Sequence, residues 1–316
     1  LLIIKHSLRV YSLKEVLFML KFDVAIIGRG PAGLSAALYT ARANLKTLII
    51  GKNDSALRKA AKIGNYFGFS GDVSGAFLLD ETEKQVLKVE ALIVDDEVVS
   101  IQKTDTFKII TSKDEYEAIT VLIATGQTQK KLNIKNLEKF EGNGVSYCTT
   151  CDGYFYNNLK TGVLGNKDYA VHEALELESY TKDITIYTNG KELDISSRYI
   201  NEISKFKINI KQVTEVSGVD FLQRIYFIDG TSEELDGLFV ANESASSTDF
   251  ARKLGVITEG NSIITDKEQQ TNLEGLFAAG DCTRGFKQVS TAVGSGAIAA
   301  RKMIEYTKIF KKRLNE

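Results

Sequence analysis

The sequence lacks the features that mark several classes of protein. Its three cysteines are too few for the disulfide framework of a secreted protein. No apolar run approaches the ~18 residues that a membrane helix needs. The formal net charge of −1 gives no overall field that would favour nucleic acid or an acidic membrane. We therefore expect a cytoplasmic protein with reduced or catalytic thiols and neither a nucleic-acid nor a membrane partner.

The remaining composition is that of an ordinary globular protein. Hydrophobic residues make up 43% and charged residues 26% of the 316 residues, a length that suits two domains. Residues 1–18 precede Met19, and their apolar stretch, residues 1–4, is too short for a signal-peptide core. We interpret residues 1–18 as upstream sequence of unknown role, or as a short extra helix, and leave them out of the functional reasoning.

Short apolar runs alternate with glycine turns and helical segments. A buried strand, a Gly28-Arg29-Gly30-Pro31-Ala32-Gly33 turn, a helix rich in small residues and a second strand form a βαβ unit near the N-terminus. A second unit of strand, turn and helix follows at residues 160–180. The expected strands are 22–27, 46–50, 121–124, 184–187 and 275–279, and the expected helices are 34–43 and a last one from about 291 to the end.

The first glycine turn fits a dinucleotide-binding loop. In such a loop the first glycine allows the tight turn, the second lets the backbone approach a pyrophosphate, and the third lets the helix pack on the strand. Gly28, Gly30 and Gly33 have that spacing, and the phosphates would meet free N–H groups at a helix N-terminus. The usual ribose-binding acid is missing, because Ile50 is followed by Gly51 and Lys52.

Cys148 and Cys151 form a CxxC motif just ahead of the second βαβ unit. Two thiols at this spacing can close a readily reduced disulfide, and the motif lowers the pKa of one thiol. Half of a zinc site is the alternative, but structural zinc takes four ligands. Only Cys282, His6 and His172 remain, and no two of them are at ligand spacing, so no metal is predicted.

Together these motifs resemble the low-molecular-weight thioredoxin reductases. The first turn, Ala124-Thr125-Gly126 and Gly280-Asp281 resemble an FAD domain. The segments 41–45 (ARANL), 148–153 (CTTCDG) and 287–288 (KQ) narrow the match, which runs from about residue 21 to 306. The resemblance implies an α/β protein of two Rossmann-like, three-layer ββα domains, the second inserted in the first. It also implies FAD as cofactor, thioredoxin as partner, a homodimer and a second domain that swings.

The implied FAD-binding domain comprises residues 19–129 and 249–316, and residues 130–248 form a redox domain that carries the CxxC. By resemblance, the first turn holds the FAD pyrophosphate, Asn65 and Ala124 line the flavin site, Asp281 lies near the ribityl chain, and Gln288 and Val289 meet the flavin edge. Ser55 to Leu57 depart from the family's pattern and put some contacts in doubt. The complete predicted set is Gly28, Gly30, Pro31, Ala32, Gly33, Gly51, Lys52, Asn65, Val98, Ala124, Gly126, Gly280, Asp281, Lys287, Gln288 and Val289.

The resemblance also assigns roles to the dithiol. Cys151 is expected to face the flavin and accept its electrons, while Cys148 attacks the partner disulfide. Asp152 would be the acid/base, because histidine is scarce, although a simple turn residue is the alternative. We expect Cys282 to be an inert core residue and His172 an ordinary helix residue.

The second nucleotide site departs from the family at several positions. Lys167 stands where a glycine lets the pyrophosphate approach, and the counter-interpretation is that it binds phosphate. By alignment, Asn189, Gly190 and Asp194 occupy the positions of arginines that grip the 2′-phosphate of NADPH. Residues 240–244 (VANES) also depart from the family's pattern. A degenerate nucleotide site is therefore expected, with a diverged site for NADH as the alternative.

A branch of this family, the ferredoxin-dependent flavin thioredoxin reductases, lacks the NADPH motifs and keeps the CxxC. The sequence looks like that branch, so reduced ferredoxin is the expected electron donor. An acidic ferredoxin would dock on basic residues, with Lys59, Lys62, Lys130 and Lys131 as candidates. An NAD(P)H-dependent reductase, an oxygen-dependent dithiol oxidase and a redox sensor without turnover remain alternatives.

Overall fold

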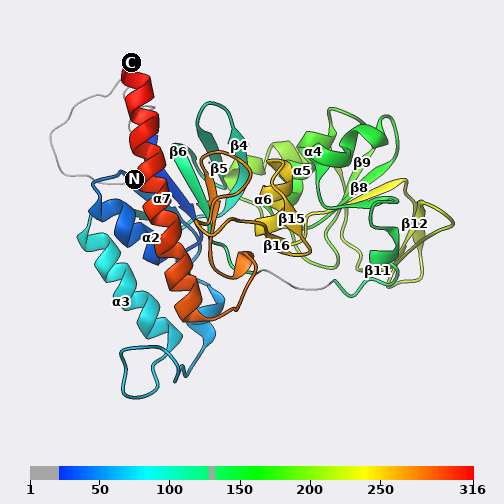
Figure 1. The fold of residues 1–316 in the computed structure, drawn as a ribbon. Helices are drawn as coiled ribbons and strands as arrows, with labels where there is room; N and C mark the ends of the chain where they lie inside the picture. The colour runs from blue at the N-terminus through cyan, green and yellow to red at the C-terminus, as the bar shows by residue number, and fades with distance from the viewer. Residues whose placement is uncertain (1–20, 128–131) are drawn as a thin grey trace.

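A computed structural model describes residues 21–127 and 132–316 of the chain. Figure 1 shows two lobes side by side, each built around its own β-sheet. The expectations for residues 1–18 and for Lys130 and Lys131 lie outside the described residues.

The first lobe contains a seven-stranded sheet in the order β3-β2-β1-β6-β5-β4, with β17 also paired to β6. Strands β3, β2, β1, β6 and β17 pair in parallel, whereas β4, β5 and β6 form an antiparallel meander. The central strands are continuous apolar runs because both faces of the sheet are covered. The strands are β1 (Lys21–Ile27), β2 (Thr47–Ile50), β3 (Leu92–Val94), β4 (Val98–Lys103), β5 (Phe107–Thr111), β6 (Glu115–Ile123) and β17 (Leu276–Ala278).

Three helices cover one face of this sheet: α2 (Pro31–Arg42), α3 (Gly75–Lys88) and α7 (Val289–Asn315). Pro31 starts α2 at a position where its missing N–H costs nothing. Small residues let α2 and α7 pack closely, since a Cβ on Gly296 would lie 2.1 Å from the carbonyl oxygen of Ala32. The segment rich in small residues therefore serves helix packing.

The second lobe contains a five-stranded parallel sheet in the order β10-β9-β8-β14-β7 and a three-stranded antiparallel sheet. The parallel strands are β7 (Val145–Ser146), β8 (Thr161–Leu164), β9 (Ile184–Tyr187), β10 (Lys207–Asn209) and β14 (Gly237–Val240). The antiparallel strands are β11 (Val213–Gly218), β12 (Leu222–Phe227) and β13 (Ser232–Glu234). The helices are α4 (Thr149–Asp152) and α5 (Asp168–Leu177).

Short elements complete the described chain. Helix α6 (Ser247–Lys253) follows the second lobe and packs on β15 (Thr258–Glu259) and β16 (Ser262–Ile263). The 3₁₀ helices are η1 (Ala56–Lys59), η2 (Glu138–Phe140), η3 (Gly153–Tyr156), η4 (Ser197–Tyr199), η5 (Glu202–Lys205) and η6 (Gly280–Cys282).

The predicted fold class is confirmed. Both sheets are flanked by helices, and the strands of the second lobe come between β6 and β17 of the first. The boundaries at 129/130 and 248/249 stay our proposal. Within the described residues, no helix is both long and apolar enough to cross a membrane.

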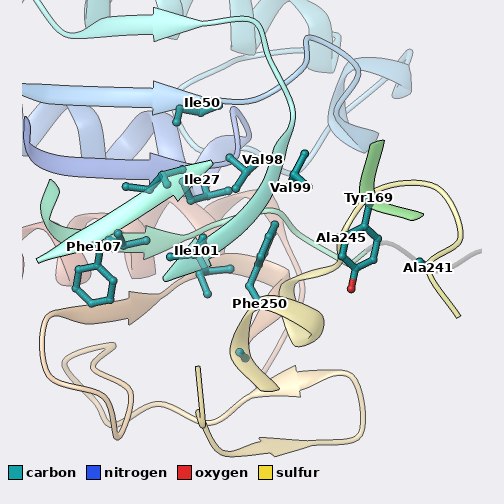
Figure 2. Packing of buried hydrophobic residues seen from close by; sticks show 14 of the residues in the cluster. Ile27, Ile50, Val98, Val99, Ile101, Phe107, Tyr169, Ala241, Ala245 and Phe250 are labelled. Carbon is teal, nitrogen blue, oxygen red and sulfur yellow. The ribbon is translucent and has the colours of Figure 1, made fainter. Parts of the chain in front are cut away.

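One hydrophobic core crosses from lobe to lobe. Figure 2 shows Phe250 of α6 with Ile101 of β4 on one side and Tyr169 of α5 on the other. All three side chains are at most 4% exposed. The lobes are therefore joined by apolar packing around α6, close to the CxxC helix α4.

Candidate active site

A cavity of about 1730 Å³ lies where the two lobes meet. Its wall contains the two cysteines of the CxxC, Asp152 and every predicted FAD-binding residue except Gly33. The residues brought together from the first lobe are Gly28, Gly30, Pro31, Ala32, Gly51, Lys52, Asn65, Val98, Ala124, Gly126, Gly280, Asp281, Lys287, Gln288 and Val289. The fold thus gathers segments from both ends of the chain around one space.

The first glycine turn forms a cradle with room on one side only. Gly28 has φ of +119°, and a Cβ there would lie 2.3 Å from the carbonyl oxygen of Ala124. A Cβ on Gly30 would meet no atom within 4 Å, so the backbone there is open to the cavity. Gly33 faces away from it, since its Cβ would lie 2.1 Å from the oxygen of Gly28. These positions fit a pyrophosphate held at the N-terminus of α2.

A buried acid stands near the expected position of the missing ribose ligand. Glu97 follows β3, the neighbour of β2, and its side chain is 9% exposed. One carboxylate oxygen pairs with Lys52, and the other, Oε1, is buried without a hydrogen-bond partner among the described residues. Glu97 lines the cavity, and its unpaired Oε1, although covered in this arrangement, is an acceptor that a hydroxyl or amino donor of an adenosine would satisfy. Sequence reasoning missed Glu97, because nothing in the run Asp95-Asp96-Glu97 signals burial.

The residues expected at the flavin line the same cavity as the first glycine turn. Asn65 donates its side-chain amide to Oε1 of Gln288 over 3.0 Å, which fixes one against the other. Gln288 is also the N-cap residue of α7, so this helix begins at the cavity. Asp281 lies in η6 on the same wall. Ser55 to Leu57, the departure from the family's pattern, also line the cavity, with Ser55 as the N-cap of η1 and Ala56 and Leu57 as its first residues.

Cys148 and Cys151 are joined in a disulfide, with an S–S distance of 2.02 Å. Cys148 is 4% exposed, whereas Cys151 is the exposed sulfur of the pair. Cys148 is the N-cap residue of α4, and the N–H of Cys151 donates to its sulfur over 3.1 Å. This bond would stabilise a Cys148 thiolate once the disulfide is reduced.

Asp152 is tied to the dithiol through Ser146. The Ser146 hydroxyl donates to Oδ2 of Asp152 over 2.6 Å and accepts from the N–H of Cys148 over 3.1 Å. The Ser146 hydroxyl group therefore bridges the carboxylate of Asp152 and the backbone of Cys148. Ser146 had not been singled out from the sequence, because its role depends on the turn that brings residue 146 beside residue 152.

The second glycine turn, residues 165–167 between β8 and α5, has its charged side chain paired within the chain. Lys167 pairs with Glu243 over 3.0 Å, and Lys191 pairs with the same carboxylate. Asp168 accepts from the N–H of Ser196 over 2.7 Å at the start of α5. The N–H of Asp194 donates to the carbonyl of Asn166 over 2.8 Å. The ammonium group of Lys167, which could bind a phosphate, is therefore engaged within the protein.

Cys282 and His172 do not line the cavity. Cys282 is fully buried, donates to the carbonyl oxygens of Ala279 and Ile123, and has its pKa raised to about 12 by burial. His172 lies in α5, with Nε2 3.1 Å from Oε1 of Glu176. In the described part of the chain, no group of three or more His, Cys, Asp or Glu residues could hold a metal ion.

The candidate docking lysines that are described line the cavity rim. Lys59 and Lys62 are exposed and border the cavity. Nζ of Lys62 lies 4.0 Å from Asp72, an exposed pair that contributes little to stability. Both ammonium groups face solvent at the mouth of the site.

Comparison with known proteins gives the family. A family model described as pyridine nucleotide-disulphide oxidoreductase matches residues 22–296. The chain belongs to this family. It is 33% identical over 309 residues to a thioredoxin reductase of Listeria innocua, an alignment that covers 93% of this chain and 96% of that protein.

Two solved structures resemble the whole chain. One, the atypical thioredoxin reductase TRi from Desulfovibrio vulgaris Hildenborough, has a TM-score of 0.87 and 40% identity and covers 90% of this chain and 98% of that one. The other, a ferredoxin-flavin thioredoxin reductase from Clostridium acetobutylicum, has a TM-score of 0.66 and 31% identity and covers 92% of this chain and 99% of that one. The chain is a flavin-dependent disulfide oxidoreductase of the thioredoxin reductase type, and its cofactor is FAD.

Bound FAD supplies the electron pair that a disulfide needs, and the protein supplies position and protons. The cradle at Gly28 and Gly30 fits its pyrophosphate, and the wall at Asn65 and Gln288 fits its ring end. Exposed Cys151 borders the same cavity, while buried Cys148 is held by the N–H groups of its own turn.

Proposed function

We propose that this enzyme reduces the disulfide of a thioredoxin with electrons from reduced ferredoxin, without NADPH or NADH. The observation that carries the choice of donor is the second glycine turn, whose charged side chain is paired within the chain. Glu243 lines the cavity and pairs with Lys167 and Lys191, while the buried Asp168 accepts from the N–H of Ser196. Lys167 could bind the pyrophosphate of a pyridine dinucleotide only by giving up its ion pair with Glu243, which weakens binding at this turn.

The missing arginines weaken nucleotide binding further. Asn189 and Gly190 offer no positive charge, and the side-chain oxygen of Asn189 already accepts from the N–H of Val213 over 2.9 Å. A charge-assisted hydrogen bond contributes about 1.5–3 kcal/mol, so the loss of two lowers affinity by roughly 10²–10⁴.

Gly165, a glycine that this turn shares with the family's motif, is not evidence for a bound nucleotide. A Cβ on Gly165 would lie 2.1 Å from the carbonyl oxygen of Ala241 and 2.8 Å from the side chain of Ala170. Packing of α5 against β8 and β14 therefore requires glycine at residue 165, whether or not a ligand binds.

Ferredoxin has the potential to drive the reaction. A ferredoxin near about −400 mV can reduce a thioredoxin near about −270 mV, and for two electrons this gap corresponds to roughly 6 kcal/mol. The flavin adapts one-electron delivery to two-electron disulfide chemistry. One of the similar structures is itself a ferredoxin-flavin thioredoxin reductase, which supports the same donor here.

We assign ferredoxin docking to the rim that carries Lys59 and Lys62. Both side chains are exposed beside the cavity, where an acidic protein could bring its cluster near the flavin. Docking through these lysines should weaken as salt rises, because exposed charges are screened within about 10 Å at 0.1 M salt. Lys130 and Lys131 stay candidates from the sequence.

Thioredoxin is assigned to the other side of the dithiol. Tyr154 and Phe155 directly follow the CxxC helix, are each 72% exposed, and form an edge-to-face pair with centroids 6.1 Å apart. An exposed aromatic pair beside a disulfide suits a protein partner. Buried Cys148 cannot meet a partner's disulfide in this arrangement, so the second lobe must move during turnover. The homodimer implied by the resemblance stays a prediction.

A reconstituted electron-transfer assay tests the proposal. Under anaerobic conditions, photoreduced ferredoxin, the enzyme and oxidised thioredoxin should produce free thioredoxin thiols, while NADPH or NADH in place of ferredoxin should produce none. Cys148→Ser should abolish the thiols and keep FAD bound. Thiol production with NADPH at a rate equal to that with ferredoxin would overturn the choice of donor. Air oxidation of the reduced flavin coupled to small-dithiol turnover would point to the oxidase instead.

A further inference from the structure

The two residues between the cysteines rest on a pair of acidic side chains. The hydroxyl of Thr149 donates to Oε2 of Glu173 over 2.7 Å, and its backbone N–H points at the same oxygen over 3.4 Å. The hydroxyl of Thr150 donates to Oε2 of Glu176 over 3.3 Å. Both carboxylates lie on α5, so they connect the CxxC helix α4 to the helix beneath it.

A lysine from another part of the chain pairs with both acids, and Glu176 also lies 3.1 Å from Nε2 of His172. Lys253, the last residue of α6, contacts Glu173 directly and lies 3.0 Å from Oε2 of Glu176. The side chains of Lys253 and Glu173 are 7% and 3% exposed. Nζ of Lys253 also lies 5.5 Å from the centre of the Tyr169 ring, so the ammonium group packs over an aromatic ring as well.

This cluster requires its cation. Burial alone would lower the pKa of Lys253, but Glu173 and Glu176 outweigh it and raise that pKa, so the ammonium stays charged. Without Lys253, the Glu173 carboxylate, 3% exposed, would be buried without a cation, which is strongly unfavourable, whereas Glu176 would keep its contact with His172. The pairing therefore constrains where α6 can lie relative to α5.

The cluster also joins the two lobes at the dithiol. Helix α6 packs on β15 and β16, which lead toward β17 of the first sheet, whereas α4 and α5 belong to the second lobe. Sγ of Cys151 lies 3.9 Å from the carbonyl oxygen of Arg252, the neighbour of Lys253. The disulfide, the acids and α6 thus form one continuous set of contacts.

We propose that Lys253, Glu173 and Glu176 form an ionic anchor that positions the disulfide toward the FAD cavity and must open before Cys148 can meet a protein partner. Lys253 and Glu173 are positioning residues, since they act through Thr149 and α4. The anchor serves the flavin-to-disulfide step whatever reduces the flavin.

In that step the disulfide takes up two electrons from reduced FAD and two protons. Its S–S bond breaks, and two thiols and oxidised FAD result. In the next step the dithiol passes the two electrons to the partner's disulfide. An anchor that favours the flavin-facing arrangement should accelerate the first step and not the second.

The test separates these two steps in the full-length, FAD-loaded enzyme. For the first, oxidised enzyme is mixed anaerobically with dithionite, and new protein thiols are trapped with maleimide over time. For the second, enzyme already reduced at the dithiol is mixed with the small disulfide DTNB. Dithionite replaces ferredoxin, so the result does not depend on the proposed electron donor.

Lys253→Met should slow thiol formation at least tenfold while the reaction with DTNB is unchanged or faster. Lys253→Arg keeps the charge and should stay within threefold of wild type. Lys302→Met, which removes a lysine paired with Glu268 and Glu305 on α7's outer side, is the matched control and should change neither step.

Thr149→Val tests the anchor without changing a charge. It removes the hydroxyl that donates to Glu173 and should slow thiol formation three- to tenfold. Wild-type thiol formation in Lys253→Met that retains FAD would overturn the proposal. If Lys253→Met loses FAD, wild-type kinetics in Thr149→Val would overturn it, as would equal slowing of both steps in either variant.

Discussion

The glycines of the first turn have different surroundings, as the sequence motif predicts. Gly33 packs its Cα against the oxygen of Gly28, whereas Gly30 faces the open cavity. The motif predicted both roles, because backbone turns of this kind depend on local spacing. Packing and ligand binding can therefore be separated at these two positions.

Gly33→Ala should cost about 1–3 kcal/mol of folding stability, because its methyl group has no room. Gly30→Ala should leave the unfolding midpoint of the FAD-free protein unchanged and lower FAD affinity. Urea unfolding and flavin fluorescence titration of the FAD-free protein measure the two effects. Equal loss of stability in both variants would contradict this division.

Glu97 illustrates what the sequence does not reveal at this scale. Glu97 lies in a polar run of sequence that is typical of a solvated loop. Only in the folded chain is its carboxylate paired with Lys52 through one oxygen and left unpaired at the other. Ser146 is similar, since its contact with Asp152 depends on the turn between them. Burial of a polar group is a tertiary property, so neither residue could be found from pattern alone.

Glu97→Ala should weaken FAD binding roughly tenfold or more, the value of one charge-assisted hydrogen bond. FMN has no adenosine, so its affinity for the FAD-free protein should be the same in both proteins. Fluorescence titrations with FAD and FMN give the comparison. A similar loss for both flavins would mean that Glu97 supports the fold and does not contact adenosine.

At the level of elements, β9 lies where the sequence predicts it, and α7 begins within two residues of the expected start. Apolar runs and glycine turns are local signals, which explains this agreement. The β4–β5 hairpin and α6 were not foreseen, because short, mixed segments carry weak periodicity. Yet α6 is the element that brings Lys253 and Phe250 between the lobes.

The ion pairs of Glu243 at the second glycine turn should make the stability of the protein depend on pH. Lys191 and Lys167 lower the pKa of Glu243 to about 2 from a usual 4.5. A lowered pKa stabilises the fold above about pH 4.5, and the effect fades as pH falls toward 2. Glu243→Gln should therefore destabilise the protein more at pH 7 than at pH 3.5 in urea unfolding.

The matched variant is Glu234→Gln, which removes an acid with an 81% exposed side chain from β13. It should cost less than Glu243→Gln at pH 7. An equal effect of Glu243→Gln at the two pH values would show that its carboxylate is not held by the lysines.

On the scale of the whole molecule, the arrangement of the lobes decides which sulfur is accessible. Besides the apolar core, Arg198 pairs with Glu115 over 2.6 Å and Ser196 donates to the carbonyl of Ser112 over 2.9 Å across the lobes. The length of the chain suggested two domains, whereas the swing was implied only by resemblance. It could not indicate this arrangement, because contacts between lobes follow no local pattern.

Partner recognition belongs to this scale as well. Phe155→Ser should raise KM for thioredoxin roughly ten- to a hundredfold, the effect of burying one large apolar side chain. Thiol formation with dithionite should be unchanged, since Phe155 is outside the anchor. Leu87→Ser, which alters a 57% exposed side chain on α3, is the control. Unchanged KM in Phe155→Ser would place the thioredoxin surface elsewhere.

The most direct test of the central claim is an anaerobic titration of the oxidised enzyme that follows the visible flavin band. NADPH, NADH and chemically reduced ferredoxin are added in turn to separate samples. We predict bleaching by ferredoxin alone, with the electrons recovered as thioredoxin thiols on later addition of thioredoxin. Stoichiometric bleaching by NADPH or NADH would contradict the account, because the second glycine turn would then bind a nucleotide although Lys167 is paired with Glu243 and the expected arginines are missing.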